Sequence, residues 1–122
     1  MELLQVALHA DDLDGAAAFY TQLLGSDPAG RFDPPGLLFF RVGRARLLLE
    51  RGAPPGLVYL EVPDLEAALA RVPESAERLG PPQRIFTHSD DALGPAGMEE
   101  WHAGIRDPDG NLVVLVALTA PG

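Results

Sequence analysis

The chain contains an internal repeat, and this repeat limits the folds available to it more than any other feature. Residues 6–18 align with residues 58–70 without a gap, at a constant offset of 52 positions. In each copy an apolar run leads to an aspartate, Asp12 or Asp64, and then to an alanine-rich segment with apolar residues three and four positions apart. Because a carboxylate accepts hydrogen bonds from the free amides at a helix start, each copy predicts a strand, an acidic cap and a helix.

Turn residues locate the remaining elements. Gly25 is suited to end the first helix, and Val72-Pro73 stops the second. The segments 33–36 and 107–110 combine aspartate, proline and glycine, which is typical of turns. Further strands are predicted over residues 37–42, 45–50, 83–87, 101–106 and 111–118. The pattern indicates an α+β fold in which a strand, a helix and three strands occur twice.

A segment rich in proline and glycine, residues 51–56, separates the two copies. The chain has 122 residues, the size of one domain. We therefore predict a single domain over residues 1–122, with a first module at 1–52, a linker at 53–56 and a second module at 57–122.

Composition excludes several classes of protein. The 18 acidic residues outnumber the 9 basic ones, which argues against a nucleic-acid partner because binding of phosphates needs clustered positive charge. The chain contains no cysteine, so disulfides and thiolate chemistry are ruled out. No segment resembles a signal peptide or approaches the roughly 20 apolar residues of a membrane span. We expect a soluble, cytoplasmic protein without a membrane partner.

Two motifs complete a resemblance to a known family. Residues 19–25 read Phe-Tyr-Thr-Gln-Leu-Leu-Gly, and residues 107–111 read Asp-Pro-Asp-Gly-Asn. Together with the repeated βαβββ plan, they resemble the vicinal oxygen chelate superfamily, which includes glyoxalase I, extradiol dioxygenases and bleomycin resistance proteins. The resemblance covers essentially the whole chain. It implies a half-open, curved mixed sheet and a homodimer whose clefts are completed across a two-fold interface.

The resemblance also implies four strand positions that hold a divalent metal on the concave face. They fall at Gln5, at Leu57, at Val114 and at either Leu48 or Glu50. Leucine and valine cannot bind a metal ion, so no metal cofactor is expected. If a metal does bind, the expected ligands are Gln5, Glu50, His9 and His102.

His9 and Glu61 occupy equivalent positions in the two copies. Strand alternation places them on the same face as Gln5 and Leu57, respectively. A neighbouring carboxylate raises the pKa of a histidine and fixes its tautomer, so the pair is a candidate general acid and base. The alternative is a solvated pair at the strand ends.

Four residues are candidates for contacts with a small molecule: Gln5, Tyr59, Trp101 and His102. Gln5 would supply a hydrogen bond at the floor of a pocket, and Tyr59 and Trp101 would form its apolar wall. The alternatives are a satisfied strand glutamine, two core aromatic residues and a structural histidine.

Other charged segments allow two interpretations each. Arg41, Arg44, Arg46 and Arg51 lie on or beside one hairpin and form either an anion clamp or a solvated face. The acidic segments 89–91 and 99–100 form a soluble face or attract cationic ligands. His88 is predicted to be a loop residue without a function.

These features predict a protein that binds a small, partly apolar organic molecule without a catalytic metal, as the resemblance to bleomycin resistance proteins implies. The first alternative is a metal-dependent lyase, isomerase, epimerase or dioxygenase with atypical ligands. The second alternative is a protein that keeps only a dimerisation role.

Overall fold

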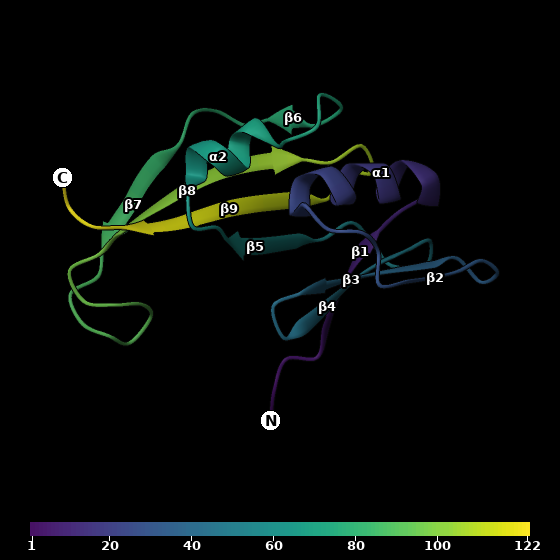
Figure 1. Cartoon of the computed structure of the whole chain (residues 1–122), viewed down its shortest axis with the longest axis horizontal. Helices are drawn as coiled ribbons and strands as arrows, with labels where there is room; N and C mark the ends of the chain where they lie inside the picture. The colour runs from purple at the N-terminus through teal and green to yellow at the C-terminus, as the bar shows by residue number, and fades with distance from the viewer.

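The computed structural model describes residues 1–122 as two mixed β-sheets with two helices along one side (Figure 1). The first half contains β1 (Gln5–His9), α1 (Leu13–Leu24), β2 (Gly30–Phe32), β3 (Leu37–Val42) and β4 (Ala45–Glu50). Its sheet, here called sheet A, has the order β1-β4-β3-β2, with β1 parallel to β4 and the other pairs antiparallel.

The second half repeats this plan with one additional strand. It contains β5 (Leu57–Glu61), α2 (Leu65–Ala70), β6 (Glu77–Arg78), β7 (Gln83–Thr87), β8 (Glu99–Arg106) and β9 (Leu112–Thr119). In its sheet, sheet B, β5 is parallel to β9, β8 is antiparallel to β9, and β6 and β7 both pair with β8. The predicted α+β class and the repeated βαβββ plan are confirmed.

Both helices begin where the sequence predicts. Asp12 caps α1 by accepting a hydrogen bond from the amide of Asp14, and Gly25 ends this helix in the left-handed conformation with φ of 71°. Asp64 caps α2 by accepting from the amide of Ala67. None of the helices is long and apolar enough to span a membrane.

Two strands were not predicted, and one begins earlier than predicted. The short strands β2 and β6 consist largely of exposed residues, so they lack the apolar alternation that identifies a strand. Strand β8 begins at Glu99 rather than Trp101, because β7 pairs with it from Thr87 opposite Glu99. Pairing with a neighbouring strand, not side-chain polarity, sets this boundary.

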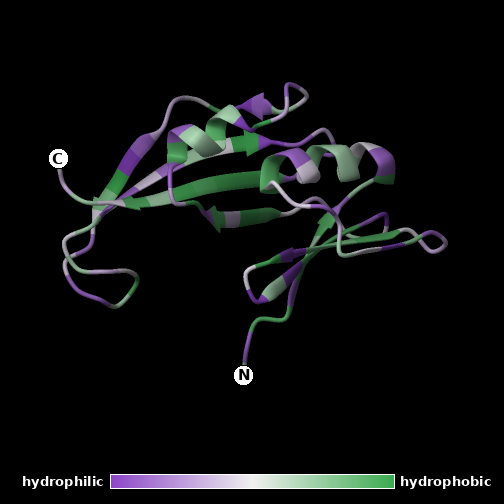
Figure 2. Cartoon of the chain, in the orientation of Figure 1, coloured by the Kyte–Doolittle hydropathy of each residue, from purple (hydrophilic) through white to green (hydrophobic).

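Strand alternation divides each sheet into two faces. Leu8, Leu47 and Leu49 of sheet A and Val113 and Leu115 of sheet B point toward the helices and belong to one shared core. Figure 2 shows that β9, the central strand of sheet B, is hydrophobic along most of its length. The opposite face of each sheet carries no helix, and we call it the concave face.

A buried polar network joins the two halves. Oδ1 of Asn111 accepts hydrogen bonds from the amides of His9 (3.0 Å) and Gly56 (2.9 Å). Its Nδ2 donates to the carbonyl of His9 (2.7 Å) and to Oδ2 of Asp107 (2.8 Å). The end of β1, the residue before β5 and the turn before β9 are therefore held by one side chain that is fully buried.

Candidate functional site

An open cavity of about 440 Å³ lies on the concave face of sheet B. Three residues in register form its floor, because Glu61 of β5 is opposite Val116 of β9, and Val116 is opposite His102 of β8. The remaining lining residues are Tyr59, Leu93, Glu100 and Leu118. The cavity combines two carboxylates and an imidazole with apolar side chains, the usual composition of a small-molecule site.

Glu100 bridges two histidines beside this cavity. Its Oε2 lies 2.6 Å from Nε2 of His102, and its Oε1 lies 3.0 Å from Nε2 of His88. A carboxylate only accepts hydrogen bonds, so Nε2 of each histidine carries a proton and donates it. His88 is 3% exposed, and its ring packs against that of Phe86 in a tilted arrangement, with 4.5 Å between the ring centroids.

The two histidines lower the pKa of Glu100. The hydrogen bond from His102 is the largest cause, burial opposes it, and the hydrogen bond from His88 adds to it. Glu100 therefore stays ionised and fixes the ring of His102, whose Nδ1 makes no hydrogen bond within the protein. In the neutral imidazole this nitrogen is an acceptor, available to a ligand or to a proton.

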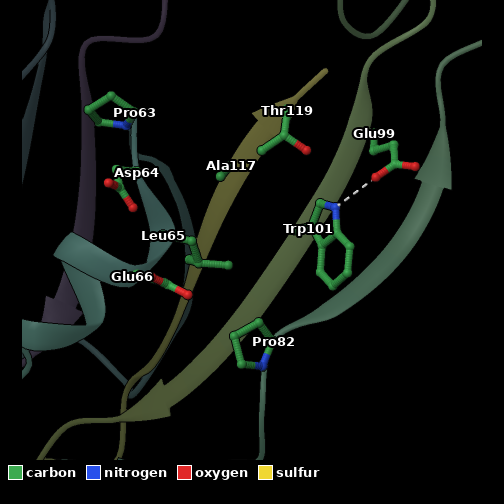
Figure 3. Close-up of a pocket in the computed structure, with 9 residues that line it drawn as sticks. All are labelled: Pro63, Asp64, Leu65, Glu66, Pro82, Glu99, Trp101, Ala117 and Thr119. Carbon is green, nitrogen blue, oxygen red and sulfur yellow. Dashed lines mark hydrogen bonds between the residues drawn. The ribbon is translucent and has the colours of Figure 1, made fainter. Parts of the chain in front are cut away.

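The structure brings Tyr59 and His102 together and separates Trp101 from them. The rings of Tyr59 and His102 pack edge to face with 5.7 Å between centroids. Trp101 precedes His102 on β8 and so points to the opposite face, where it lines a different pocket (Figure 3). Tyr59 and Trp101, which were expected to wall one pocket, thus line two different pockets, because the register of β5, β9 and β8 places His102 rather than Trp101 on the face of Tyr59.

Gln5 lies on sheet A and is engaged by an arginine. Nε of Arg46 donates to its Oε1 at 3.0 Å, and the guanidinium of Arg46 lies 5.6 Å from the ring centroid of Phe39. The other arginines near this hairpin are surface residues, and Arg44 and Arg51 form ion pairs with Glu2 and Asp33. The structure does not place Gln5 in the cavity of sheet B.

His9 and Glu61 do not form a pair. Nδ1 of His9 lies 2.8 Å from the carbonyl of Ala53, and its Nε2 lies 3.0 Å from Oδ1 of Asp11. The hydrogen bond with Asp11 is the main cause that raises the pKa of His9. Glu61 makes no hydrogen bond or ion pair and belongs to the sheet B cavity, so each residue has a separate environment.

Comparison with known proteins places this architecture in a family. The family model of the glyoxalase/bleomycin resistance protein/dioxygenase superfamily matches residues 2–115. The chain belongs to this superfamily. Among curated proteins, none matches the chain significantly.

Solved structures show the same fold. The chain is 26% identical to a lactoylglutathione lyase from Agrobacterium tumefaciens, covers 95% of its own length and 92% of that chain, and superimposes with a TM-score of 0.67. A glyoxalase/bleomycin resistance protein from Albidiferax ferrireducens T118 is 20% identical, with coverage of 94% and 98% and a TM-score of 0.66. TioX from Micromonospora sp. ML1 is 19% identical, with coverage of 96% and 98% and a TM-score of 0.70.

The residues at the superfamily's metal positions do not fit a metal ion. Leu57 and Val114 lie on neighbouring strands of sheet B and present only hydrocarbon. In sheet A, Gln5 is opposite Arg46 and Glu50 is opposite His9, four residues further along. Four residues of strand span about 13 Å, so Gln5 and Glu50 cannot bind one ion.

The four ligands expected for a bound metal are likewise dispersed. His102 belongs to sheet B and is held by Glu100, whereas Gln5, Glu50 and His9 belong to sheet A. One cluster elsewhere has metal-ligating atoms within 4.8 Å of one another, and it consists of His9, Asp11 and Asp109. In this cluster Nε2 of His9 already makes a hydrogen bond with Oδ1 of Asp11.

Glu100 and His88 lie beside the cavity but were not among the site residues expected from the sequence. His88 lies in a loop directly after β7, as predicted. Glu100 lies outside the predicted strand 101–106. Because β8 begins at Glu99, Glu100 and His102 are two positions apart on one strand and share a face. The burial of His88 has no local signal in the sequence. It depends on residues 89–97 folding back, so that the amide of His88 donates a hydrogen bond to the carbonyl of Met98 at 2.9 Å.

Proposed function

We propose that this protein binds a small, partly apolar organic molecule on the concave face of sheet B, without a catalytic metal. One observation carries the proposal: the neighbouring strands β5, β9 and β8 place Glu61, Val116 and His102 side by side in one open cavity, on a face that no helix covers. Val116 lies between Glu61 and His102, Leu118 lies opposite Glu100, and Leu93 adds a further apolar contact, so apolar and polar side chains are interleaved in the cavity. This mixed lining suits a small, partly apolar ligand that also carries hydrogen-bonding groups.

The imidazole of His102 is held in place before a ligand arrives. Glu100 holds His102 in one tautomer, and His88 holds Glu100 from the buried side. Side chains that are already in place lose little conformational entropy on binding, which favours affinity. The hydrocarbon side chains at the superfamily's metal positions support a role in binding rather than metal-dependent catalysis.

We propose that a second copy of the chain completes the cleft. Strands β1 and β5 are the outer strands of their sheets, so each has one unpaired edge. Leu57 and Tyr59 on the edge strand β5 are 49% and 58% exposed, so two large apolar side chains lie uncovered beside the unpaired edge. Sedimentation analysis tests this: we expect a dimer for the wild type and a monomer for Leu57→Glu.

A fragment screen followed by amide chemical shifts tests the binding function. We expect bound fragments to shift residues of β5, β8 and β9, and His102→Ala or Tyr59→Ala to weaken binding at least about tenfold. Glu74→Gln, an exposed change far from the cavity, is the control. Fragments that shift only other surfaces would contradict the proposed site.

Metal analysis tests the proposal that the protein binds its ligand without a catalytic metal. The natively purified protein is analysed for bound metals and then titrated with Mn²⁺, Ni²⁺, Zn²⁺ and Fe²⁺ while its thermal midpoint is followed. Because a ligand of the folded state raises the midpoint, we expect no stoichiometric metal and no concentration-dependent rise. Stoichiometric metal that His102→Ala or Glu50→Ala removes would instead support a metal-dependent enzyme.

A further inference from the structure

A second pocket lies on the helix-facing side of sheet B, behind the concave face. Figure 3 shows Leu65 and Glu66 of α2 on one side of it, Trp101 of β8 on the other side and Pro82 at one end. Its volume is about 470 Å³, and Ala117 and Thr119 of β9 also line it. The pocket contains none of the residues that form the concave cavity.

The pocket exists because the two halves of the chain differ in length. Strands β8 and β9 have eight residues each, whereas β3 and β4 have six. Helix α2 has six residues, whereas α1 has twelve. The longer strands therefore extend beyond the cover of the shorter helix, and the half-buried ring of Trp101 is left at the border.

Hydrogen bonds hold the indole ring in place. Nε1 of Trp101 donates to Oε1 of Glu99 at 3.2 Å, and Oε2 of Glu99 accepts from the guanidinium of Arg84 at 3.3 Å. The one polar atom of the indole is thus satisfied within the protein. What the ring can offer to a molecule in the pocket is its apolar, electron-rich surface.

The other charged groups of the pocket are acidic. Glu66 makes no hydrogen bond or ion pair, and Asp64 accepts one hydrogen bond, from the amide of Ala67. Glu99 is paired with Arg84, and no arginine is among the lining residues. The pocket therefore places an uncompensated carboxylate, Glu66, across from an aromatic ring.

We propose that this pocket binds a small organic ammonium ion, with the alkylated nitrogen against the indole of Trp101 and its charge balanced by Glu66. A cation over a tryptophan face is attracted by the ring quadrupole, and tryptophan is the most effective residue in this role. Pro82, Leu65 and Ala117 provide contacts for the alkyl groups. A neutral molecule of the same shape would keep the apolar contacts and lose both electrostatic ones.

The choice of probe separates these contributions. Choline is compared with 3,3-dimethylbutan-1-ol, which has the same shape with carbon in place of the charged nitrogen. Trp101 is the one tryptophan of the chain, so its fluorescence reports on this pocket alone. We expect a saturable change with choline, and an affinity at least about fivefold higher than for the neutral alcohol.

Charge-neutralising variants test the role of the carboxylate. Glu66→Gln should lower the affinity for choline about three- to tenfold and leave that for the alcohol unchanged. The control Glu74→Gln removes the same charge from another surface and should change neither. Calorimetry with Trp101→Leu, after its fold is checked by circular dichroism, should show no choline binding.

Three results would overturn the proposal. They are the absence of a saturable response to choline, equal affinities for choline and the alcohol, and the same choline affinity in Glu66→Gln and Glu74→Gln. Because the concave cavity contains no tryptophan, these results leave the proposed function of that cavity untouched.

Discussion

The hydroxyl of Tyr20 donates a hydrogen bond of 2.6 Å to Oδ2 of Asp107, which lies 87 residues later in the chain. Burial raises the pKa of Tyr20, and the charge of Asp107 raises it further, so the hydroxyl remains a donor. Oδ1 of Asp107 accepts from the amides of Asp109 and Asn111 and so shapes the turn. The two motifs that carry the family resemblance thus meet in one buried network that holds α1 to the turn before β9.

Removing the hydroxyl of Tyr20 should weaken the fold. Tyr20→Phe keeps the ring in the core and leaves Asp107 without one of its donors, so we expect a loss of about 1.5–3 kcal/mol in the free energy of unfolding. Urea denaturation measures this. Tyr59→Phe, on an exposed tyrosine, is the matched control and should change the value by less than about 0.5 kcal/mol. Equal effects of the two changes would argue against a stabilising role for the hydrogen bond.

Asn111→Ala should destabilise the protein more than Tyr20→Phe. It leaves the partly buried amides of His9 and Gly56 without this acceptor and leaves Oδ2 of Asp107 with the Tyr20 hydroxyl as its remaining donor. We expect a loss of about 3 kcal/mol or more, again measured with urea. Gln83→Ala, at an exposed strand position, serves as the control. A loss below about 1 kcal/mol would show that the network does not join the two halves.

The contribution of His9 should fall as the pH rises. The pKa of His9 is raised above its ordinary value, chiefly by the hydrogen bond to Asp11, so the folded state holds this proton more tightly than the unfolded state. The stabilisation is fully present below the unfolded pKa and is lost as the pH rises through the folded pKa.

Thermal midpoints of the wild type and His9→Gln, measured between about pH 5 and pH 9, test this direction. The thermal midpoint of the wild type should exceed that of His9→Gln by the largest amount at the acidic end of this range. Asp11→Asn should remove most of the pH dependence, because Asp11 is its main cause. A difference in thermal midpoint between wild type and His9→Gln that grows with pH would contradict this prediction.

Gly94→Ala should disturb the histidine pair of the concave cavity. A Cβ at position 94 would lie 2.8 Å from Cε1 of His88, whose ring is buried and cannot move aside freely. We expect a loss of about 1–3 kcal/mol in stability and a pKa of Glu100 closer to its ordinary value, because the bond to His88 weakens.

Carbon-detected NMR of Glu100 and urea denaturation measure these two effects. Gly52→Ala is the control, since the nearest atom to its Cβ would be 3.6 Å away. In the double variant Gly94→Ala/His88→Ala the clash is absent. The stability losses of the two single variants should therefore not add. Full additivity would mean that position 94 acts through other contacts.

Local sequence patterns determined most of the architecture. The repeat, the caps Asp12 and Asp64, the turn glycine Gly25 and the strands at 37–42, 45–50 and 83–87 agree with the structure, because periodicity and turn chemistry act within a few residues. The short strands β2 and β6 escaped prediction, because pairing with a neighbour, not their own residues, makes them strands.

The tertiary structure alone decided which side chains meet. The register of β1 on β4 separates Gln5 from Glu50, and the folding back of residues 89–97 buries His88 against Glu100. Such contacts depend on which strands become neighbours and in which register. That choice is made by burial of the whole core and by long-range hydrogen bonds, and it leaves no local pattern in the sequence from which the site could be read.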